Sequence, residues 1–473
     1  MNLGGNLARK VLKTKIICTI GPASDSPEIL RQMIEEGMDI ARLNFSHGDF
    51  AQHLSRLKTI RAISSELGKE VCIMQDLPGV KIRIGEFKEG SVFLSPGQIF
   101  TLRTDLVEGN QNQVYVDYPE LWRFVKPGER VILDDGNLQF RVLSKEEGEV
   151  KCKVEIGGEL KGRKGAIFPD SSLPLPSLTD ADKRALEFGA QIGVDMVAVS
   201  FVREARNITD VKELLKEFGV PDVQVIAKIE EAQGLRNLKS IVDVADGIMV
   251  ARGDLGVCLP REEVPLFQER IVKTCRRKGK PVIVATQMLE SMVSCPVPTR
   301  AEVTDVAQAA LQGADAVMLS AETAVGKYPV EAVREVRKIL EIVEASPEFR
   351  RTVEMERRYP SKPTVEQAIC MSMDILSETA EVKIIVLEAK TGHMVRILSS
   401  YRPAAPVYVV TDSPKLAKSC LLWWGLRPWV GRVESLLQKL KEEGMLSAGD
   451  KVLLSREIPE GPLRAGIGIL EVS

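Results

Sequence analysis

The sequence predicts an α/β protein built on a closed (β/α)₈ TIM barrel, with an inserted β-barrel lid domain and a C-terminal α/β domain. The first observation is a repeated pattern, in which a short apolar run precedes an amphipathic segment with helical spacing. This alternation indicates parallel strands with helices outside them. Eight such runs fit one closed barrel, and they lie at residues 14–22, 38–46, 70–79, 194–202, 222–231, 245–254, 280–288 and 314–322.

The second observation is an interruption of this pattern between the third and fourth runs. Short alternating strands and turn signals such as Asp135-Gly136 predict a separate β domain there. The third observation is a new series of strands and helices after the eighth run. We therefore expect barrel segments at 1–80 and 176–345, the lid at 81–175 and the C-terminal domain at 346–473. This division agrees with a loose expectation of ~150 residues per domain.

Composition excludes several classes of protein. Hydrophobic residues make up 44% and charged residues 27% of the 473 residues, as in ordinary globular proteins. The net charge of −2 argues against electrostatic binding of nucleic acid, and the apolar runs are too short to span a bilayer. The N-terminal segment lacks an apolar signal core, and the 8 cysteines include no C-x-x-C pair. We expect a reduced, cytoplasmic protein without membrane or nucleic-acid partners.

The candidate site comes from the ends of the barrel strands, where barrel enzymes place their active residues. This set is rich in cations and carboxylates but contains no paired histidine and serine, which argues against covalent acyl transfer. A phosphorylated or carboxylated substrate with a divalent metal ion suits it better. The strand ends supply Arg42, Asn44, Ser46, Asp76, Ser200, Lys228, Glu230, Arg252, Gly253, Asp254, Thr286, Ser320 and Glu322.

Lys228 and Glu230 lie two residues apart at the end of one strand, so their side chains point the same way. Glu230 and Asp254 follow adjacent strands, and two carboxylates without His or Cys suit Mg²⁺ or Mn²⁺. Gly253 lets the backbone approach a ligand, and the amide groups there can bind an anion. The alternative is a pair of salt bridges with Lys228 and Arg252, and spacing alone does not decide between the two.

Seven motifs in order along the chain resemble pyruvate kinase: TIGPAS, ARLNFSHG, VIAKIE, IMVARGDLG, VATQMLESM, PTRAEVTDVA and MLSAETAVGKYP. The resemblance covers the barrel, the lid and, more loosely, the C-terminal domain. It implies transfer of a phosphoryl group from phosphoenolpyruvate to ADP, which gives pyruvate and ATP. It also implies that the chain assembles as a homotetramer.

The resemblance implies a role for each matching residue. Lys228 and Arg42 would neutralise the transferring phosphoryl group, and Glu230 and Asp254 would hold Mg²⁺ or Mn²⁺. The amides of Gly253 and Asp254, with the Thr286 hydroxyl, would bind the substrate carboxylate. Thr286 would also lie near the carbon that takes a proton, with Ser320 and Ser200 in the polar network behind it. The nucleotide would contact Pro22, Asn44, Arg83, Lys164 and Asp135.

One departure from the family concerns potassium. Many members bind K⁺ through residues that match Asn44, Ser46, Asp76 and the backbone of Leu77. Lys81 stands where the K⁺-dependent members carry glutamate, and its ammonium is itself a monovalent cation. We therefore predict that K⁺ is not required; the alternative is that Lys81 is a surface charge at the lid hinge.

The C-terminal domain of this family commonly binds an effector. In the loop AKTGHM at 389–394, Lys390, Thr391 and Gly392 suit a phosphate. Ala389 and Met394 replace two hydroxyl-bearing residues of the sugar-bisphosphate-regulated members, which argues against fructose 1,6-bisphosphate. Another phosphorylated effector, or none, stays open.

Two other functions fit parts of the pattern. A Mg²⁺-dependent barrel aldolase or lyase acting through pyruvate enolate would share the carboxylate pair and an arginine. It would not need the long lid insertion or a nucleotide pocket. A non-enzymatic role as a metabolite-sensing module would not need the complete set of Lys228, Glu230, Asp254 and Thr286.

Overall fold

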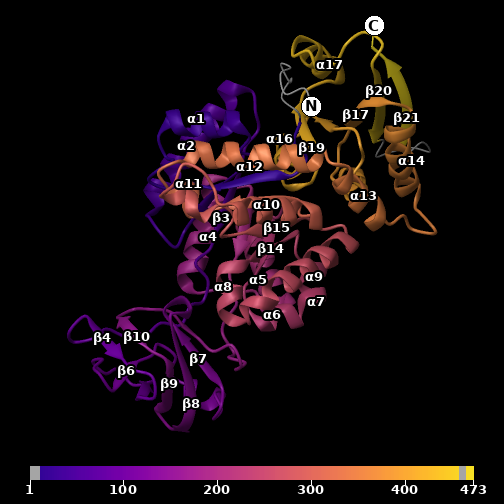
Figure 1. Ribbon diagram of the computed structural model, residues 1–473. Helices are drawn as coiled ribbons and strands as arrows, with labels where there is room; N and C mark the ends of the chain where they lie inside the picture. Colours follow the sequence, from indigo (N-terminus) through magenta and orange to yellow (C-terminus); the bar gives the residue numbers. More distant parts are fainter. Residues whose placement is uncertain (1–10, 458–464, 473) are drawn as a thin grey trace.

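The structure is a computed structural model that describes residues 11–457 and 465–472. Its three parts are a central barrel, an inserted β domain below it and a C-terminal domain above it in the view of Figure 1. The outer ends of two expected domains, at residues 1–10 and 473, lie outside the described residues, as do residues 458–464.

The predicted barrel is confirmed. Its eight strands form one closed, parallel sheet in sequential order around the barrel. Each strand lies within one of the apolar runs identified in the sequence. They are β1 (Lys15–Thr19), β2 (Ile40–Asn44), β3 (Cys72–Asp76), β12 (Met196–Val199), β13 (Gln224–Ile229), β14 (Gly247–Ala251), β15 (Val282–Ala285) and β16 (Ala316–Leu319).

Helices surround the barrel and cover its apolar strands, so almost every strand residue is buried. The larger ones are α1 (Pro27–Glu36), α2 (Phe50–Leu67), α4 (Asp180–Ile192), α5 (Ala205–Glu217), α7 (Leu238–Val244), α9 (Val264–Arg277), α10 (Arg300–Gln312) and α12 (Pro329–Glu344). Shorter ones are α6 (Ala232–Arg236), α8 (Arg252–Cys258) and α11 (Ala321–Ala324). A capping box of Thr299 and Glu302 begins α10, and Gly313 caps its C-terminus with a left-handed φ of 98°.

The inserted domain contains two sheets that share one apolar core, which includes Leu94, Phe100, Phe140 and Leu160. The six-stranded sheet contains β5 (Ile99–Arg103), β6 (Gln113–Tyr115), β7 (Arg130–Leu133), β8 (Leu138–Glu146), β9 (Glu149–Ile156) and β11 (Ala166–Ile167). The two-stranded sheet contains β4 (Ser91–Leu94) and β10 (Gly158–Lys161), and a short helix, α3 (Leu121–Phe124), precedes β7. All these elements lie inside the expected range 81–175, and the predicted turn at Asp135-Gly136 joins β7 to β8.

The C-terminal domain is a five-stranded sheet with helices. Its strands are β17 (Val382–Glu388), β18 (Val407–Thr411), β19 (Leu426–Val430), β20 (Lys451–Glu457) and the antiparallel β21 (Ala465–Glu471). Its helices are α14 (Val365–Thr379), α15 (His393–Tyr401), α16 (Pro414–Ser419) and α17 (Val433–Glu442), and α13 (Pro347–Glu356) leads into it. Leu421 and Leu422 of this domain join the apolar cluster inside the barrel, so the C-terminal domain helps to close the barrel floor.

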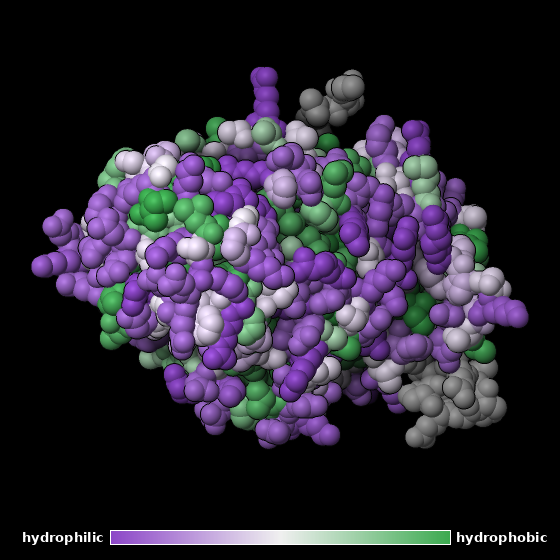
Figure 2. All heavy atoms as spheres, turned by 90° about the horizontal axis from the view of Figure 1, so that it is seen from below, coloured by the Kyte–Doolittle hydropathy of each residue, from purple (hydrophilic) through white to green (hydrophobic). Residues whose placement is uncertain are grey.

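The surface is mainly hydrophilic, as the composition of an ordinary globular protein predicts. Seen from below, the molecule is covered mainly by hydrophilic side chains, and apolar side chains gather only in small groups (Figure 2). No helix in the described part of the chain is long and apolar enough to cross a membrane. Cys295 is exposed, whereas the other cysteines are buried.

Candidate active site

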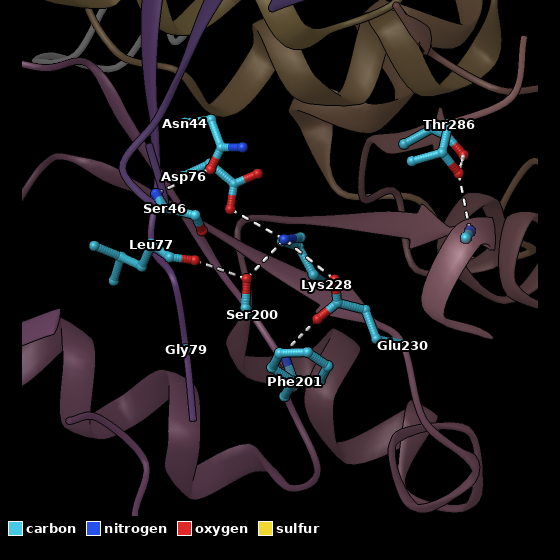
Figure 3. Close-up of polar contacts among 12 residues, drawn as sticks. Asn44, Ser46, Asp76, Leu77, Gly79, Ser200, Phe201, Lys228, Glu230 and Thr286 are labelled. Atoms are coloured by element: carbon cyan, nitrogen blue, oxygen red, sulfur yellow. Dashed lines mark hydrogen bonds and ion pairs between the residues drawn. The ribbon is translucent and has the colours of Figure 1, made fainter. Parts of the chain in front are cut away.

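Lys228, near the end of β13, is the centre of a buried polar network at the carboxyl ends of the barrel strands (Figure 3). Its Nζ lies 3.0 Å from Oδ1 of Asp76 and 3.1 Å from Oε1 of Glu230, and it donates a hydrogen bond of 2.6 Å to Ser200 Oγ. Burial alone would lower the pKa of Lys228, but the two carboxylates outweigh burial and raise it. The ammonium therefore stays charged. Ser200 Oγ in turn donates to the carbonyl of Leu77 at 2.7 Å.

Arg42 is fixed beside this ammonium by two neighbours. Its Nε donates to Asp76 Oδ2 at 2.7 Å, and its Nη1 donates to Thr19 Oγ1 at 2.8 Å. Asp76 thus binds one cation with each oxygen. Its pKa is lowered, because these two cations outweigh the effect of burial. Arg42 and Lys228 therefore share one carboxylate and direct two positive charges at the same end of the barrel.

Glu230 is 2% exposed and lies on the other side of Lys228 from Asp76. Its Oε2 accepts a hydrogen bond of 2.5 Å from the backbone of Phe201. Burial, together with the charge of Asp254, raises the pKa of Glu230 to about 7 against the opposing effect of Lys228. Asp254 is thus close enough to Glu230 to influence it electrostatically. It stands in the first turn of α8, directly after the strand that pairs with β13.

Thr286 follows β15 in a left-handed conformation, with φ of 68°, and Gln287 beside it has φ of 54°. Such values are uncommon for residues other than glycine, above all for a β-branched threonine, and cost about 1–3 kcal/mol each. Thr286 Oγ1 accepts a hydrogen bond of 2.9 Å from the Gly253 amide and donates one of 2.7 Å to the Ala285 carbonyl. The structure therefore brings Thr286 and Gly253 into direct contact.

Ser320 follows β16 on the same face of the barrel and precedes α11. Its backbone amide donates to Glu322 Oε2 at 2.7 Å, and the other oxygen of Glu322 accepts from the Leu289 amide at 3.0 Å. The Ser320 hydroxyl is buried and has no hydrogen-bond partner within the described part of the chain. An unpaired buried hydroxyl is costly unless a ligand or water satisfies it.

Family models match nearly the whole chain. The model for the barrel domain of pyruvate kinase matches residues 11–333, and the model for its α/β domain matches residues 367–465. The chain belongs to the pyruvate kinase family. It is thus a phosphotransferase enzyme, and its barrel and C-terminal domain are the two domains of that family.

Individual pyruvate kinases agree with this assignment. That of Sporosarcina psychrophila is 41% identical over 459 residues, covering 95% of this chain and 78% of the relative. Pyruvate kinase 2 of a Synechocystis strain is 41% identical over 461 residues, covering 95% and 77%. The crystal structure of a pyruvate kinase from Cryptosporidium parvum has a TM-score of 0.92 at 33% identity, covering 97% of this chain and 96% of the other.

The residues that the resemblance led us to expect at a potassium site gather on one side of Lys228. Asn44 and Asp76 are paired across β2 and β3, and the Ser46 amide donates to Asn44 Oδ1 at 3.1 Å. Figure 3 shows these residues with Leu77 around the network. Lys81 is not part of this group, because its Nζ pairs with Asp135 Oδ1 of the inserted domain at 3.1 Å.

The residues expected on the nucleotide side are divided between the barrel and the inserted domain. Pro22 is exposed at the barrel mouth after β1. Arg83 Nη1 donates to the carbonyl of Arg163 at 3.0 Å, and Lys164 pairs with Asp134 at 2.6 Å. These two side chains face other residues of the inserted domain. In the C-terminal domain, Thr391 Oγ1 accepts from the His393 amide at 3.4 Å, and Gly392 precedes α15 without a side-chain cap.

Two residues of the site were missed by the sequence analysis. Thr19, which holds Arg42, is the last residue of β1, so the rule of collecting strand ends would have included it. Phe201 donates its amide to Glu230 from a left-handed conformation with φ of 53°. A non-glycine residue in that region has no local sequence signature, so no pattern indicates it.

Arg252 contacts the strained turn at Thr286, and substitution of Arg252 tests whether this contact positions Thr286. Its Nη2 and Nε donate to the Thr286 carbonyl at 2.5 and 3.2 Å, and its Nη1 pairs with Asp305 at 2.6 Å. We expect Arg252→Met to lower kcat about 10- to 100-fold with a smaller change in the KM of the substrate, because a shift near 1 Å has effects of this size.

The matched variant is Arg252→Lys, which keeps the charge but provides no planar fork. Steady-state kinetics should place it between the wild type and Arg252→Met. Equal kcat values for all three proteins would show that the turn holds Thr286 without Arg252.

Proposed function

We propose that this chain transfers the phosphoryl group of phosphoenolpyruvate to ADP with the help of a divalent metal ion, as the last step of glycolysis. Membership of the pyruvate kinase family supports the reaction. The observation that carries the proposal is the position of Lys228 Nζ, 3.1 Å from Glu230 on a rigid barrel strand and beside Arg42. The ammonium of Lys228 and the carboxylate that would bind the metal ion, Glu230, are therefore held next to each other at the end of β13.

Lys228 and Arg42 act on the group that moves. Phosphoryl transfer depends mainly on positioning and on positive charge around the equatorial phosphate oxygens. The bond between phosphorus and the enol oxygen breaks, and a terminal oxygen of the ADP β-phosphate forms the new bond to phosphorus. The two cations stabilise the phosphoryl oxygens and the enolate that remains. Their fixed positions avoid reorganisation during the reaction.

Glu230 and Asp254 would hold the metal ion. A buried carboxylate whose pKa is raised by burial and by a second carboxylate is suited to a cation that neutralises both. In the part of the chain that is described, no group of three or more His, Cys, Asp or Glu side chains could hold a metal ion. Two carboxylates leave positions for substrate oxygens and water, as Mg²⁺ or Mn²⁺ prefers. When bound, the ion supplies further positive charge to the phosphoryl group.

Thr286 and the amides at Gly253 and Asp254 would bind the carboxylate of the substrate. The hydrogen bond from the Gly253 amide to Thr286 holds these groups together. The enolate then takes a proton at its methylene carbon and becomes pyruvate. The unpaired hydroxyl of Ser320, together with Ser200, provides polar groups for that transfer through water.

The inserted domain would act as a lid over the nucleotide. Gly79 at its hinge has φ of 75°, and a Cβ there would lie 2.6 Å from Ser200 Cβ, so only glycine fits. Closure would bring Arg83, Lys164 and Asp135 toward the barrel residues Pro22 and Asn44. It would also exclude water that competes for the phosphoryl group.

A coupled assay tests the function. We expect ATP and pyruvate to form in equal amounts from phosphoenolpyruvate and ADP, and only when Mg²⁺ or Mn²⁺ is present. Consumption of pyruvate with an aldehyde, without any need for ADP, would instead indicate the aldolase or lyase alternative. The inserted domain and the family membership do not favour that alternative.

We further propose that the enzyme does not require K⁺. Asp76, which matches a potassium ligand of the family, already binds Lys228 and Arg42 with its two oxygens. Lys81, which stands where the K⁺-dependent members carry glutamate, is 26% exposed and pairs with Asp135 of the inserted domain. Movement of that domain would have to bring its ammonium to the group around Asp76. We expect kcat to change less than twofold when K⁺ is added to a buffer free of K⁺ and Na⁺.

Lys81→Glu should create a requirement for K⁺, seen as at least a tenfold rise in activity on adding the ion. Lys145→Glu is the matched control, because Lys145 lies in the same domain and donates to the Arg123 carbonyl at 3.3 Å, with no carboxylate partner among the described residues. A strong activation of the wild type by K⁺ would refute the proposal.

Family membership also supports a homotetramer in the cytoplasm. We include in the proposal a phosphorylated effector bound by Lys390, Thr391 and Gly392 at the start of α15. Light scattering after size exclusion would measure the assembly.

A further inference from the structure

The inserted domain is joined to the barrel by two connections, and Asp182 binds both of them. The entering connection follows β3, and the returning connection leads into α4. Asp182 lies in the first turn of α4, and its side chain is buried. Its Oδ1 accepts a hydrogen bond of 3.0 Å from the Gly79 amide. Its Oδ2 accepts from the amide and the hydroxyl of Thr179 at 2.9 and 2.7 Å.

Capping of α4 accounts for only part of this arrangement. Thr179 and Asp182 form a capping box, in which each side chain accepts a hydrogen bond from the backbone amide of the other residue. The box uses one carboxylate oxygen of Asp182. The other oxygen binds Gly79 on the far side of the insertion in the sequence, which a helix cap does not require.

The entering connection is held at both ends of a short free stretch. Asp182 binds the Gly79 amide on the barrel side, and the Ile82 carbonyl accepts from the Ala166 amide of the inserted domain at 2.8 Å. Residues 80–81 between these contacts make no hydrogen bond between backbone groups within the described part of the chain. A stretch of this kind can absorb the φ and ψ changes of a hinge.

The returning connection is divided in the same way. Ser171 Oγ donates to Glu129 of the inserted domain at 2.6 Å, whereas Ser177 Oγ donates to Asp210 of α5 at 2.7 Å. The residues between these two contacts, 172–176, form the second free stretch.

A cavity of about 50 Å³ lies between the two free stretches and the barrel. Val80 and Lys81 line it from the entering connection, Leu173 and Leu175 from the returning connection, and Phe201 from the barrel. Close packing resists displacement, so unfilled space beside both stretches gives them room to move.

Gly79 also lies against the polar network around Lys228 (Figure 3). A Cβ on Gly79 would lie 2.6 Å from Ser200 Cβ and 3.0 Å from the ring of Phe201. Ser200 accepts from Lys228, and the Phe201 amide donates to Glu230. A pivot held at Gly79 therefore leaves these groups in place while the inserted domain moves.

We propose that Asp182 is a positioning residue for the reaction, which fixes the pivot of the inserted domain by binding both of its connections to α4. This role rests on the proposed function of the inserted domain as a lid over the nucleotide. The lid then rotates about residues 80–81 and 172–176 and returns to one position over the barrel. Without the bond to Gly79, the entering connection gains freedom and the lid closes less often in the productive position.

Hydrogen exchange of the full chain measures the contact at the pivot. We expect the Gly79 amide to exchange at least tenfold faster in Asp182→Ala than in the wild type, because it loses its acceptor. Thr179→Ala is the matched variant, since it weakens the same helix cap but leaves the bond from Gly79 to Asp182 in place. Its Gly79 amide should exchange within twofold of the wild-type rate.

Steady-state kinetics tests whether the contact positions the lid. The side chains that would meet the nucleotide, Arg83 and Lys164, are on the inserted domain, whereas the phosphoryl-binding groups are on the barrel. We expect Asp182→Ala to raise the KM for ADP at least fivefold and to change the KM for phosphoenolpyruvate less than twofold. Thr179→Ala and Asp180→Asn should keep the wild-type KM for ADP; the Asp180 side chain lies in the same helical turn and is 87% exposed. Simple loss of folded enzyme would lower kcat without this difference between the two KM values.

Asp182→Asn is the conservative variant, because it keeps the volume of the side chain and one acceptor oxygen. Its KM for ADP should lie between those of the wild type and Asp182→Ala, and it replaces Asp182→Ala in both experiments if that variant does not stay folded. The proposal is overturned if either the Gly79 exchange rate or the KM for ADP in the Asp182 variants equals that in Thr179→Ala. Failure of the wild type to form ATP would overturn the proposed function instead, and the exchange rates would still decide whether Asp182 holds the hinge.

Discussion

Lys228→Met is expected to lower kcat by about 10²–10³-fold, which corresponds to ~3–4 kcal/mol of transition-state stabilisation. The ammonium lies between Asp76 and Glu230, and its charge faces the end of the barrel where the phosphoryl group would bind. Methionine has a similar length but no charge and no N–H donor. The loss therefore removes one electrostatic stabiliser without opening a large cavity.

The KM for phosphoenolpyruvate should change less than kcat in this variant. Arg42 would still bind the phosphoryl group in the ground state, whereas the charge on the leaving enolate develops only in the transition state. Steady-state kinetics at saturating metal and ADP gives both values. If kcat decreases by less than tenfold, Lys228 is a structural partner of Asp76 and not a catalytic group.

Loss of the fold is the competing explanation for low activity. Removing Lys228 leaves two buried carboxylates with fewer cations, which destabilises the site. Ser200→Ala is a useful comparison, because it removes a hydrogen bond of 2.6 Å to the same ammonium but keeps the charge. Thermal unfolding of both variants separates the two effects. Lys228→Met must stay folded at the assay temperature for its kcat to be meaningful.

Much of this site could be predicted because parallel strands of a barrel all end at one face. Arg42, Asp76, Lys228 and Glu230 come from three strands far apart in the sequence, yet the rule of collecting strand ends placed them together. The apolar runs that mark these strands are long and regular, so the positions of their ends follow directly from the sequence.

The partner of Lys81 could not be predicted in the same way. Its contact with Asp135 depends on how the inserted domain is oriented on its hinge, and no local pattern sets that angle. The left-handed backbone at Thr286 and Phe201 also lacked a signal, since neither residue is glycine.

Glu230→Gln is expected to weaken activation by Mg²⁺ at least about 100-fold and to lower kcat at any metal concentration that can be reached. An amide is a poorer ligand for Mg²⁺ than a carboxylate. The substitution also leaves Asp254 as the one remaining carboxylate of the proposed pair, which halves the negative charge that attracts the ion. The substitution keeps the size and the acceptor atom, so the hydrogen bond from the Phe201 amide can persist. Titration of activity with Mg²⁺ and Mn²⁺ measures the effect.

Glu231→Gln provides a matched control, since it makes the same chemical change one residue later. Glu231 pairs with Arg203 at 2.8 Å and does not contact Lys228. Its activation by Mg²⁺ should resemble that of the wild type. If both variants respond to metal like the wild type, Glu230 serves only as the salt-bridge partner of Lys228, and the ion must bind elsewhere. A metal effect confined to Glu230→Gln would assign both functions to this one carboxylate, which explains why a buried strand ends with an ammonium and an acid facing the same point.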